Sequence, residues 1–301
     1  MNFLIWDFVI KQFGASLIDV EKLNKSISQL KSKNGSNGTS SAIFQLKRQI
    51  NIEKKTALIS VIIPVLQEEK ILEFTLKLYT QELRRKYNIE VIISDGGSKD
   101  KTLEIAENYA DMIVSHNGNH RQTIAEGRNK GAEVSKGDIL VFINGDTFPQ
   151  NAEHFFEFIR NWNNEQTPYT KVSALACPVY VAPDEILFKD RIFYKLHNLY
   201  IRLLISLGFG MGRGECQIIK REEFFKVGGY NPDIAAGEDF DLFRRICKTG
   251  KIGFANEILV YESPRRFRKY GYLRILFSWT INSLSVIFRG KSVSKEWEAV
   301  R

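Results

Sequence analysis

LISVIIPV, residues 58–65, is the stretch that decides which class of fold we expect for this chain of 301 residues. Apolar and β-branched residues follow one another in it without the alternation of a half-exposed strand, which is typical of a strand buried on both faces. The same kind of run returns as IEVIISD (89–95), MIVSH (112–116) and DILVFINGD (138–146). We therefore predict four buried strands between residues 58 and 146.

Stretches of helical character separate these runs, at 68–86, 99–110 and 123–135. This regular alternation of strand and helix predicts an α/β fold with a mostly parallel central sheet, right-handed crossovers and flanking helices. In such a sheet, ligands bind beyond the carboxyl ends of the strands. Polar side chains follow the predicted strands at those ends, which predicts a ligand site there.

The sequence SDGGSKDKT (94–102) follows the second strand. Its glycines let a ligand approach the backbone closely, and the Asp95 carboxylate can accept hydrogen bonds from a base or a ribose. The same residues also suit a tight turn in which Ser98 or Asp100 caps the next helix. The G-x-G-x-x-G spacing of a dinucleotide site is absent, which disfavours NAD as a ligand.

The fourth strand leads into FINGDTFPQN (142–151), which places Asn144, Gly145 and Asp146 at its carboxyl end. A carboxylate in this place can hold a Mg²⁺ or Mn²⁺ ion that bridges two oxygens of a diphosphate. The alternative is a turn in which Asp146 caps the following helix. We favour the ligand site because Asp95 and Asp146 end strands of one sheet and should face one crevice.

An acid pair, Glu238 and Asp239, opens the segment GEDFDLFRR (237–245). A carboxylate here can act as a general base toward a hydroxyl group. Acidic residues also suit the positive end of a helix dipole, which is the alternative explanation. The preceding GRGECQIIKREEFFKVGGY (212–230) predicts a strand, a helix and a Gly-Gly turn, which would deliver the acid pair into a pocket.

In this order, the segments resemble the motifs of the family 2 glycosyltransferases, which have the GT-A fold. The motifs are P-x-x-Q-E, S-D-G-G-S-x-D-x-T, G-R-N-x-G, N-G-D-T, and V-G-G-Y followed by G-E-D-F-D-L-F-R-R, all within residues 57–262. The resemblance implies inverting transfer of a hexose from a nucleoside-diphosphate sugar, usually UDP-linked, to an acceptor hydroxyl, in cell-envelope polysaccharide assembly. It implies a nucleotide-binding half at 57–147, an acceptor half at 148–262, and Mn²⁺ or Mg²⁺ as cofactor.

The resemblance also implies roles for individual residues. Asp239 would be the catalytic base with Glu238 beside it, and Asp146 would bind the metal. The nucleotide would contact Pro64, Glu68, Asp95, Ser98, Arg121, Arg128 and Asn144. Two positions depart from the family pattern: D-G-G-S stands for D-D-G-S, and Asn144 stands for the first acid of D-x-D. Because an amide binds a divalent ion less tightly than a carboxylate does, we expect the diphosphate to supply much of the coordination.

The C-terminal tail, 263–301, holds nine basic and two acidic residues, and so carries seven of the eight net positive charges. SPRRFRK (263–269) precedes a predicted helix at 271–289, which has a narrow polar stripe of Gly271, Arg274, Ser278, Asn282, Ser285 and Arg289. Basic residues beside an apolar helix favour contact with an anionic membrane, and packing on the core or on a second chain is the alternative. A second segment, 184–210, is predicted to form a helix with an apolar face of Ile192, Leu196, Leu199, Leu203 and Leu207. This helix either covers the acceptor side of the domain or forms a second membrane-facing surface that admits a lipid-linked acceptor.

Residues 1–56 read as an N-terminal appendage and flexible linker without the features of a signal peptide, and no run reaches the length of a spanning helix. We therefore expect a cytoplasmic protein, peripheral on the inner face of the membrane. Two other functions are less consistent with the sequence. A nucleotidyltransferase would need a Gly/Arg/Lys-rich loop where this chain has PVLQEEK (64–70), and a nucleic-acid-binding protein would spread its basic residues over a folded face. We expect no nucleic-acid partner, and the oligomeric state stays open.

Overall fold

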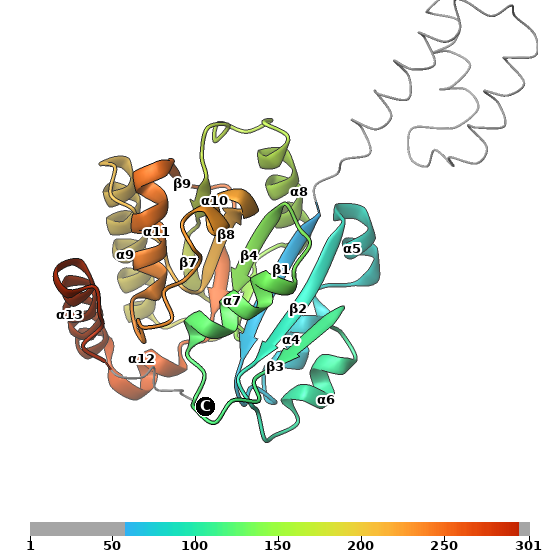
Figure 1. Cartoon of the computed structure of the whole chain (residues 1–301). Coiled ribbons are helices and arrows are strands. Elements are labelled where there is room, and N and C mark those ends of the chain that lie inside the picture. The colour runs from blue at the N-terminus through green and yellow to red at the C-terminus, as the bar shows by residue number, and fades with distance from the viewer. Residues whose placement is uncertain (1–57, 295–301) are drawn as a thin grey trace, which may run out of the picture. The chain divides into compact units, whose positions relative to one another are not determined.

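The computed structural model describes residues 58–294 (Figure 1). At its centre lies a seven-stranded sheet with the strand order β3-β2-β1-β4-β8-β6-β9. Its strands are β1 (Ile59–Val65), β2 (Ile89–Asp95), β3 (Met112–Ser115), β4 (Ile139–Ile143), β6 (Ala174–Ala176), β8 (Cys216–Lys220) and β9 (Ile252–Phe254). Only β8 runs against the others within this sheet, since it pairs antiparallel with β4 and β6. The prediction of a mostly parallel sheet is confirmed; the appendage predicted over 1–56 lies outside the described residues.

Helices cover both faces of the sheet. They are α4 (Leu72–Lys77), α5 (Gln81–Tyr87), α6 (Thr102–Glu107), α7 (Ile124–Val134), α8 (Ala152–Asn163), α9 (Phe188–Ser206), α10 (Arg221–Lys226), α11 (Glu238–Thr249), α12 (Arg265–Tyr270) and α13 (Tyr272–Arg289). Val61 and Ile63 of β1 belong to the core cluster with α4, α5 and α8, whereas Ile62 belongs to the cluster with α7, α10 and α11. This burial on both faces explains why the strand sequence is apolar throughout.

The helix predicted over 68–86 is two helices, α4 and α5. The chain leaves helical geometry at Thr80, whose backbone is extended and whose side chain accepts a hydrogen bond from the Leu83 amide. Threonine in this position is a favourable N-cap, because it satisfies an amide that has no partner within the helix. The prediction of one continuous helix did not account for this cap.

A second, three-stranded sheet was not predicted from the sequence. It consists of β5 (Thr147–Pro149), β10 (Val260–Glu262) and β7 (Val179–Val181), in that order. Strand β10 brings the chain back beside the end of β4, where the Ser263 amide donates a hydrogen bond of 3.3 Å to the Asp146 carbonyl. Helix α12 starts directly after it, beyond the carboxyl ends of the central strands (Figure 1).

Helix α13 confirms the amphipathic helix predicted at 271–289, although its burial is unusual. Its buried residues are Ile275, Asn282 and Val286, so one member of the predicted polar stripe faces the protein. Asn282 there accepts hydrogen bonds from the Val293 and Ser294 amides. No helix within residues 58–294 is long and apolar enough to cross a membrane.

Candidate active site

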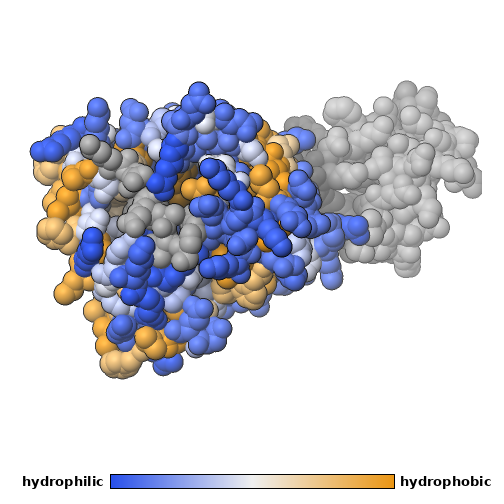
Figure 2. Space-filling view, turned by 90° about the horizontal axis from the view of Figure 1, so that it is seen from below, coloured by the Kyte–Doolittle hydropathy of each residue, from blue (hydrophilic) through white to orange (hydrophobic). Residues whose placement is uncertain are grey.

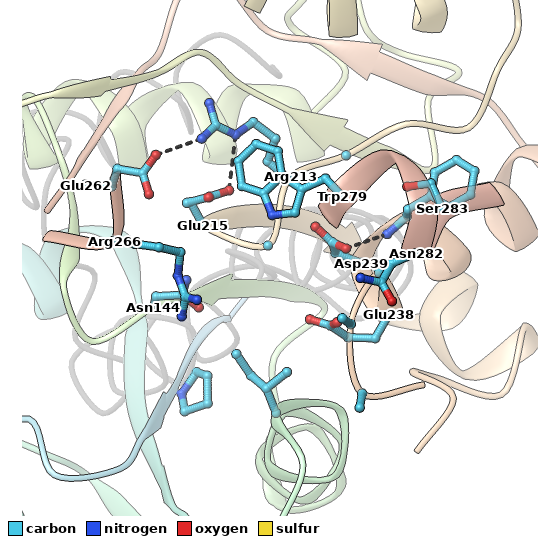
Figure 3. Close-up of a pocket in the computed structure, with 18 of the residues that line it drawn as sticks. Asn144, Arg213, Glu215, Glu238, Asp239, Glu262, Arg266, Trp279, Asn282 and Ser283 are labelled. Carbon is cyan, nitrogen blue, oxygen red and sulfur yellow. Dashed lines mark hydrogen bonds and ion pairs between the residues drawn. The ribbon is translucent and has the colours of Figure 1, made fainter. Parts of the chain in front are cut away.

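A cavity of about 1000 Å³ opens at the carboxyl ends of the central strands. Eight of the ten site residues predicted from the sequence line it: Pro64, Glu68, Arg121, Arg128, Asn144, Asp146, Glu238 and Asp239. Figure 3 shows Asn144 on one side of this space and the Glu238 and Asp239 carboxylates on the other. The fold therefore brings together segments that are more than a hundred residues apart in the chain.

Asp95 and Ser98 do not line this cavity, which corrects the expectation that Asp95 and Asp146 face the same crevice. Asp95 is fully buried, and its carboxylate accepts hydrogen bonds from the Gly97 and Ser98 amides at 3.0 and 3.1 Å. Strand β1 also lies between β2 and β4 in the sheet, which separates the two aspartates. The D-G-G-S segment is thus a self-capped turn, in which Gly97 adopts a left-handed backbone with φ of 93°.

Arg128 connects the two sides of the cavity. Its guanidinium, which is almost fully buried, donates hydrogen bonds to Glu238 at 2.9 Å, to Asn144 at 3.1 Å and to the Gly214 carbonyl at 2.6 Å. A buried cation of this kind is stable only when it is paired and hydrogen-bonded. Arg128 therefore fixes the acid pair of α11 relative to the end of β4.

The G-R-N-x-G motif explains how α7 delivers Arg128. A side-chain carbon on Gly131 would lie 2.4 Å from Ile62, so only glycine lets α7 pack this closely on β1. Asn129 donates to the Tyr230 carbonyl at 2.8 Å and accepts from its amide at 2.9 Å. One helical turn thus sets the distance to the sheet, aims the arginine and anchors the V-G-G-Y turn.

The acid pair sits in the first turn of α11, which begins after Gly237. Burial and the neighbouring charge of Asp239 raise the pKa of Glu238 to about 7, against the pull of Arg128. Burial also raises the pKa of Asp239, although Arg128 opposes this shift. Carboxylates with raised pKa values in a cavity are suited to take up protons near neutral pH.

Asp146 and Glu68 share an unexpected partner, Arg265. The Nη2 atom of Arg265 lies 2.7 Å from Glu68 Oε2 and 2.9 Å from Asp146 Oδ2. Arg268 of the same helix binds the fully buried Asp190 of α9. The interpretation of SPRRFRK as a basic cluster facing a membrane is therefore wrong for these two arginines, because each is bound to carboxylates of the protein.

Other cavity residues escaped the sequence analysis. Arg213 is buried between two glutamates, with hydrogen bonds of 3.1 Å to Glu215 and 2.7 Å to Glu262 (Figure 3). Arg266 also lines the cavity, and burial lowers its pKa despite the pull of Asp146. Arg265 lies 197 residues from Glu68 and 119 from Asp146 in the chain, so no local spacing could have linked them.

The side chains at the end of β4 suit a cation, although no group of three or more His, Cys, Asp or Glu side chains within residues 58–294 forms a ready metal site. One carboxylate oxygen of Asp146 and one of Glu68 already contact the same nitrogen of the Arg265 guanidinium cation. Oxygen ligands of this kind are the ones that Mg²⁺ and Mn²⁺ prefer. The donor set therefore fits a divalent ion that takes further ligands from its substrate.

Apolar side chains of α9 and α13 extend the cavity wall, among them Leu196, Leu204, Trp279 and Ile287. The apolar face predicted in 184–210 is exposed, since each of its five residues is at least 47% accessible. In Figure 2, hydrophobic side chains gather along the left edge, the side on which Figure 1 draws α9 and α13. The charged cavity is thus continuous with an apolar surface.

Comparison with known proteins identifies the family. The model of the family "Glycosyl transferase family 2" matches residues 60–212, about half of the chain. The chain belongs to glycosyl transferase family 2. This assignment favours sugar transfer over the nucleotidyltransferase and nucleic-acid-binding alternatives.

An uncharacterized glycosyltransferase of Rickettsia typhi is 25% identical to this family 2 chain over 214 residues, which cover 67% of the chain and 63% of the relative. Among solved structures, the mannosyltransferase PcManGT from Pyrobaculum calidifontis, in complex with GDP-Man and Mn²⁺, has a TM-score of 0.53 at 20% identity, covering 68% of this chain and 56% of that one. Glucosyl-3-phosphoglycerate synthase from Mycobacterium tuberculosis, in complex with Mn²⁺, UDP and phosphoglyceric acid, has a TM-score of 0.53 at 16% identity, covering 80% of both chains. These likenesses establish the GT-A fold.

Proposed function

We propose that this family 2 glycosyltransferase transfers a hexose, with inversion, from a nucleoside-diphosphate sugar to an acceptor hydroxyl. The observation that carries the proposal is the arrangement around Arg128, whose guanidinium joins Glu238 of the acid pair to Asn144 at the end of β4. A base and a diphosphate site that face one cavity are what a single displacement needs.

The donor lies, in this proposal, against Pro64, Glu68, Arg121, Arg128, Asn144 and Asp146. UDP is the proposed nucleotide; the two solved neighbours described above hold GDP-Man and UDP. Asp95 and Ser98 act indirectly, because their hydrogen bonds hold the turn after β2 in shape. The Ser94 hydroxyl is buried at the cavity wall without a hydrogen-bond partner in the described residues, and a ligand hydroxyl would supply one.

A divalent cation, Mn²⁺ or Mg²⁺, is the proposed cofactor, with Asp146 as its protein ligand and Glu68 close by. When bound, it would neutralise negative charge on the leaving diphosphate. Both neighbours described above were solved with Mn²⁺, which supports this part of the proposal.

Asp239 is the proposed general base. The acceptor hydroxyl gives its proton to the Asp239 carboxylate while its oxygen forms the new bond to the anomeric carbon of the sugar. The bond between that carbon and the diphosphate oxygen breaks on the opposite face, so the configuration inverts and the nucleoside diphosphate leaves with the bond electrons. Arg128 places a positive charge beside both carboxylates and donates a hydrogen bond to Glu238.

The acceptor is proposed to be lipid-linked, as in cell-envelope polysaccharide assembly, with the protein peripheral on the cytosolic face of the membrane. The apolar walls that α9 and α13 add to the cavity support this choice, because they offer a lipid chain a path away from the charged site. The exposed apolar residues of both helices would face the bilayer.

A thermal-shift screen of nucleotide sugars with Mn²⁺ or Mg²⁺ tests the donor site. We expect one nucleotide sugar to raise the melting temperature only when the metal is present, because a ligand that binds the folded state stabilises it. If no UDP- or GDP-linked sugar shifts the melting temperature with either metal, the proposed function is wrong.

A further inference from the structure

Arg265 places its positive charge between the carboxylates of Glu68 and Asp146 at the end of β4. A single nitrogen of its guanidinium contacts both Glu68 and Asp146, at 2.7 and 2.9 Å. Its side chain is 25% exposed, so it can be reached from the cavity. Burial disfavours its charge, but Asp146 and Glu68 outweigh this effect and raise the pKa of Arg265.

Two carboxylates at this point create a conflict for a site that receives a diphosphate. Without a counter-charge they would repel the phosphate oxygens. The planar guanidinium fork matches the oxygens of a phosphate as well as those of a carboxylate. Arg265 therefore has two classes of partner within one cavity, and Arg266 follows it on the same wall.

The position of Arg265 favours movement of its side chain alone. It is the first residue of α12, directly after Pro264, and Ser263 is tied to the Asp146 carbonyl by a backbone hydrogen bond. Arg268, on the same short helix, is tied to the buried Asp190. The backbone around Arg265 is thus anchored at both ends, while its long side chain can turn within the cavity.

We propose that Arg265 exchanges partners during donor binding. With no donor, its guanidinium neutralises Asp146 and Glu68; with the donor in place, it turns to the diphosphate oxygens and leaves Asp146 free to hold the divalent cation. The inference rests on the donor site of the proposed function and adds a binding residue to it.

The exchange predicts opposite effects on two affinities when Arg265 is replaced by Gln. Mn²⁺ should bind the nucleotide-free protein several-fold more tightly, because its competitor for Asp146 is gone. UDP should bind the Mn²⁺-saturated protein roughly 10- to 100-fold more weakly, the range of a lost charge-assisted hydrogen bond. A residue that only supports the fold would not separate the two affinities in this way.

Isothermal titration calorimetry on the full chain measures both quantities, with MnCl₂ and UDP as the probes. The variants are Arg265→Gln and Arg265→Lys, and the matched control is Lys269→Gln, which removes one charge from an exposed position of the same helix. Arg265→Lys keeps the positive charge but loses the fork, so we expect nearly unchanged Mn²⁺ affinity and weaker UDP binding. It also serves as the folded test protein if Arg265→Gln does not fold.

Lys269→Gln should leave both affinities as in the wild type. The inference is overturned if the Arg265 variants bind UDP as the wild type does, or if Arg265→Gln weakens Mn²⁺ and UDP binding together. Either result would leave the proposed function intact as long as the wild type binds UDP with Mn²⁺. A wild type that binds neither UDP nor GDP with Mn²⁺ would overturn both proposals.

Discussion

Gly214 illustrates how closely the residues of this site approach one another. A side-chain carbon there would lie 3.1 Å from Arg128 Nη2 and 3.3 Å from Asp239 Oδ2. Glycine therefore leaves room for the guanidinium and the proposed base side by side. The Gln217 side-chain amide of β8 fixes the same region, since it donates a hydrogen bond of 3.3 Å to the Asp239 carbonyl.

Replacing Asp239 with Asn should keep the shape of the site and remove its ability to accept a proton. We expect kcat to fall roughly 10²- to 10⁴-fold, the usual contribution of a positioned base, while the donor binds nearly as before. Steady-state kinetics of sugar transfer and calorimetry of the donor measure the two effects. Normal transfer by Asp239→Asn together with an inactive Glu238→Gln would assign the base to Glu238 instead.

The raised pKa values of the acid pair predict the pH dependence of the reaction. A base must be ionised to accept a proton, so kcat/KM should fall as the pH drops and the pair becomes protonated. Because burial raises the pKa of Asp239, the proposed base, this fall should begin at a higher pH than the pKa of an ordinary aspartate would give. A pH profile that stays flat down to about pH 5, close to the pKa of an ordinary carboxyl group, would contradict this electrostatic account.

At the scale of elements, an ion pair joins α12 to α9, beside the packing of the Phe267 ring on Phe193 and Tyr194. Arg268 donates to Asp190, which is fully buried and also accepts a hydrogen bond from the Leu187 amide. Replacing Arg268 with Met should destabilise the protein by about 1–3 kcal/mol, because the buried Asp190 carboxylate loses its charged partner while the exposed side of the pair stays solvated. Urea denaturation checks this value. Lys269→Met, at the exposed neighbouring position, should cost less than Arg268→Met, because an exposed contact such as that of Lys269 with the Tyr270 ring contributes about 0.5–1 kcal/mol. An equal loss in both variants would mean that the pair is not the cause.

The predicted membrane contact now depends on helices α9 and α13, because the structure removes part of its basic contribution. Since Arg265 and Arg268 bind protein carboxylates, the contact must rely more on exposed apolar residues such as Leu273, Phe277 and Phe288. We expect the chain to co-sediment with anionic vesicles, and replacement of these three by Ser to reduce the bound fraction severalfold. Phe74→Ser, on the exposed side of α4, is the control. A wild type that stays in the supernatant at every lipid composition would contradict the membrane contact.

Over the whole molecule, the sequence predicted those strands and helices that short stretches of residues determine by themselves. The apolar runs predicted β1 to β4, and the helical character of residues 123–135 predicted the helix that carries Arg128. The sequence could not predict that Asp95 turns inward, because D-G-G-S suits a ligand site and a capped turn equally well. Nor could it predict the contact of Arg265 with Asp146, since that contact depends on the three-stranded sheet that returns the chain to the end of β4.

The predicted boundaries at residues 147 and 262 remain predictions, but the described part of the tail does not stand apart from the cavity. Arg265, Phe267 and Trp279 all line it. The cavity therefore draws on both ends of the described chain, from β1 to α13.

Calorimetry of UDP binding with and without Mn²⁺, on the wild type and on Asp146→Ala, tests the central claim that the donor diphosphate binds at the end of β4. We expect the wild type to bind UDP with an affinity that depends on Mn²⁺, and Asp146→Ala to lose that dependence. Asp239→Asn, which alters the same cavity without touching the proposed metal ligand, should keep it. Full Mn²⁺-dependent affinity for UDP in Asp146→Ala would contradict the account.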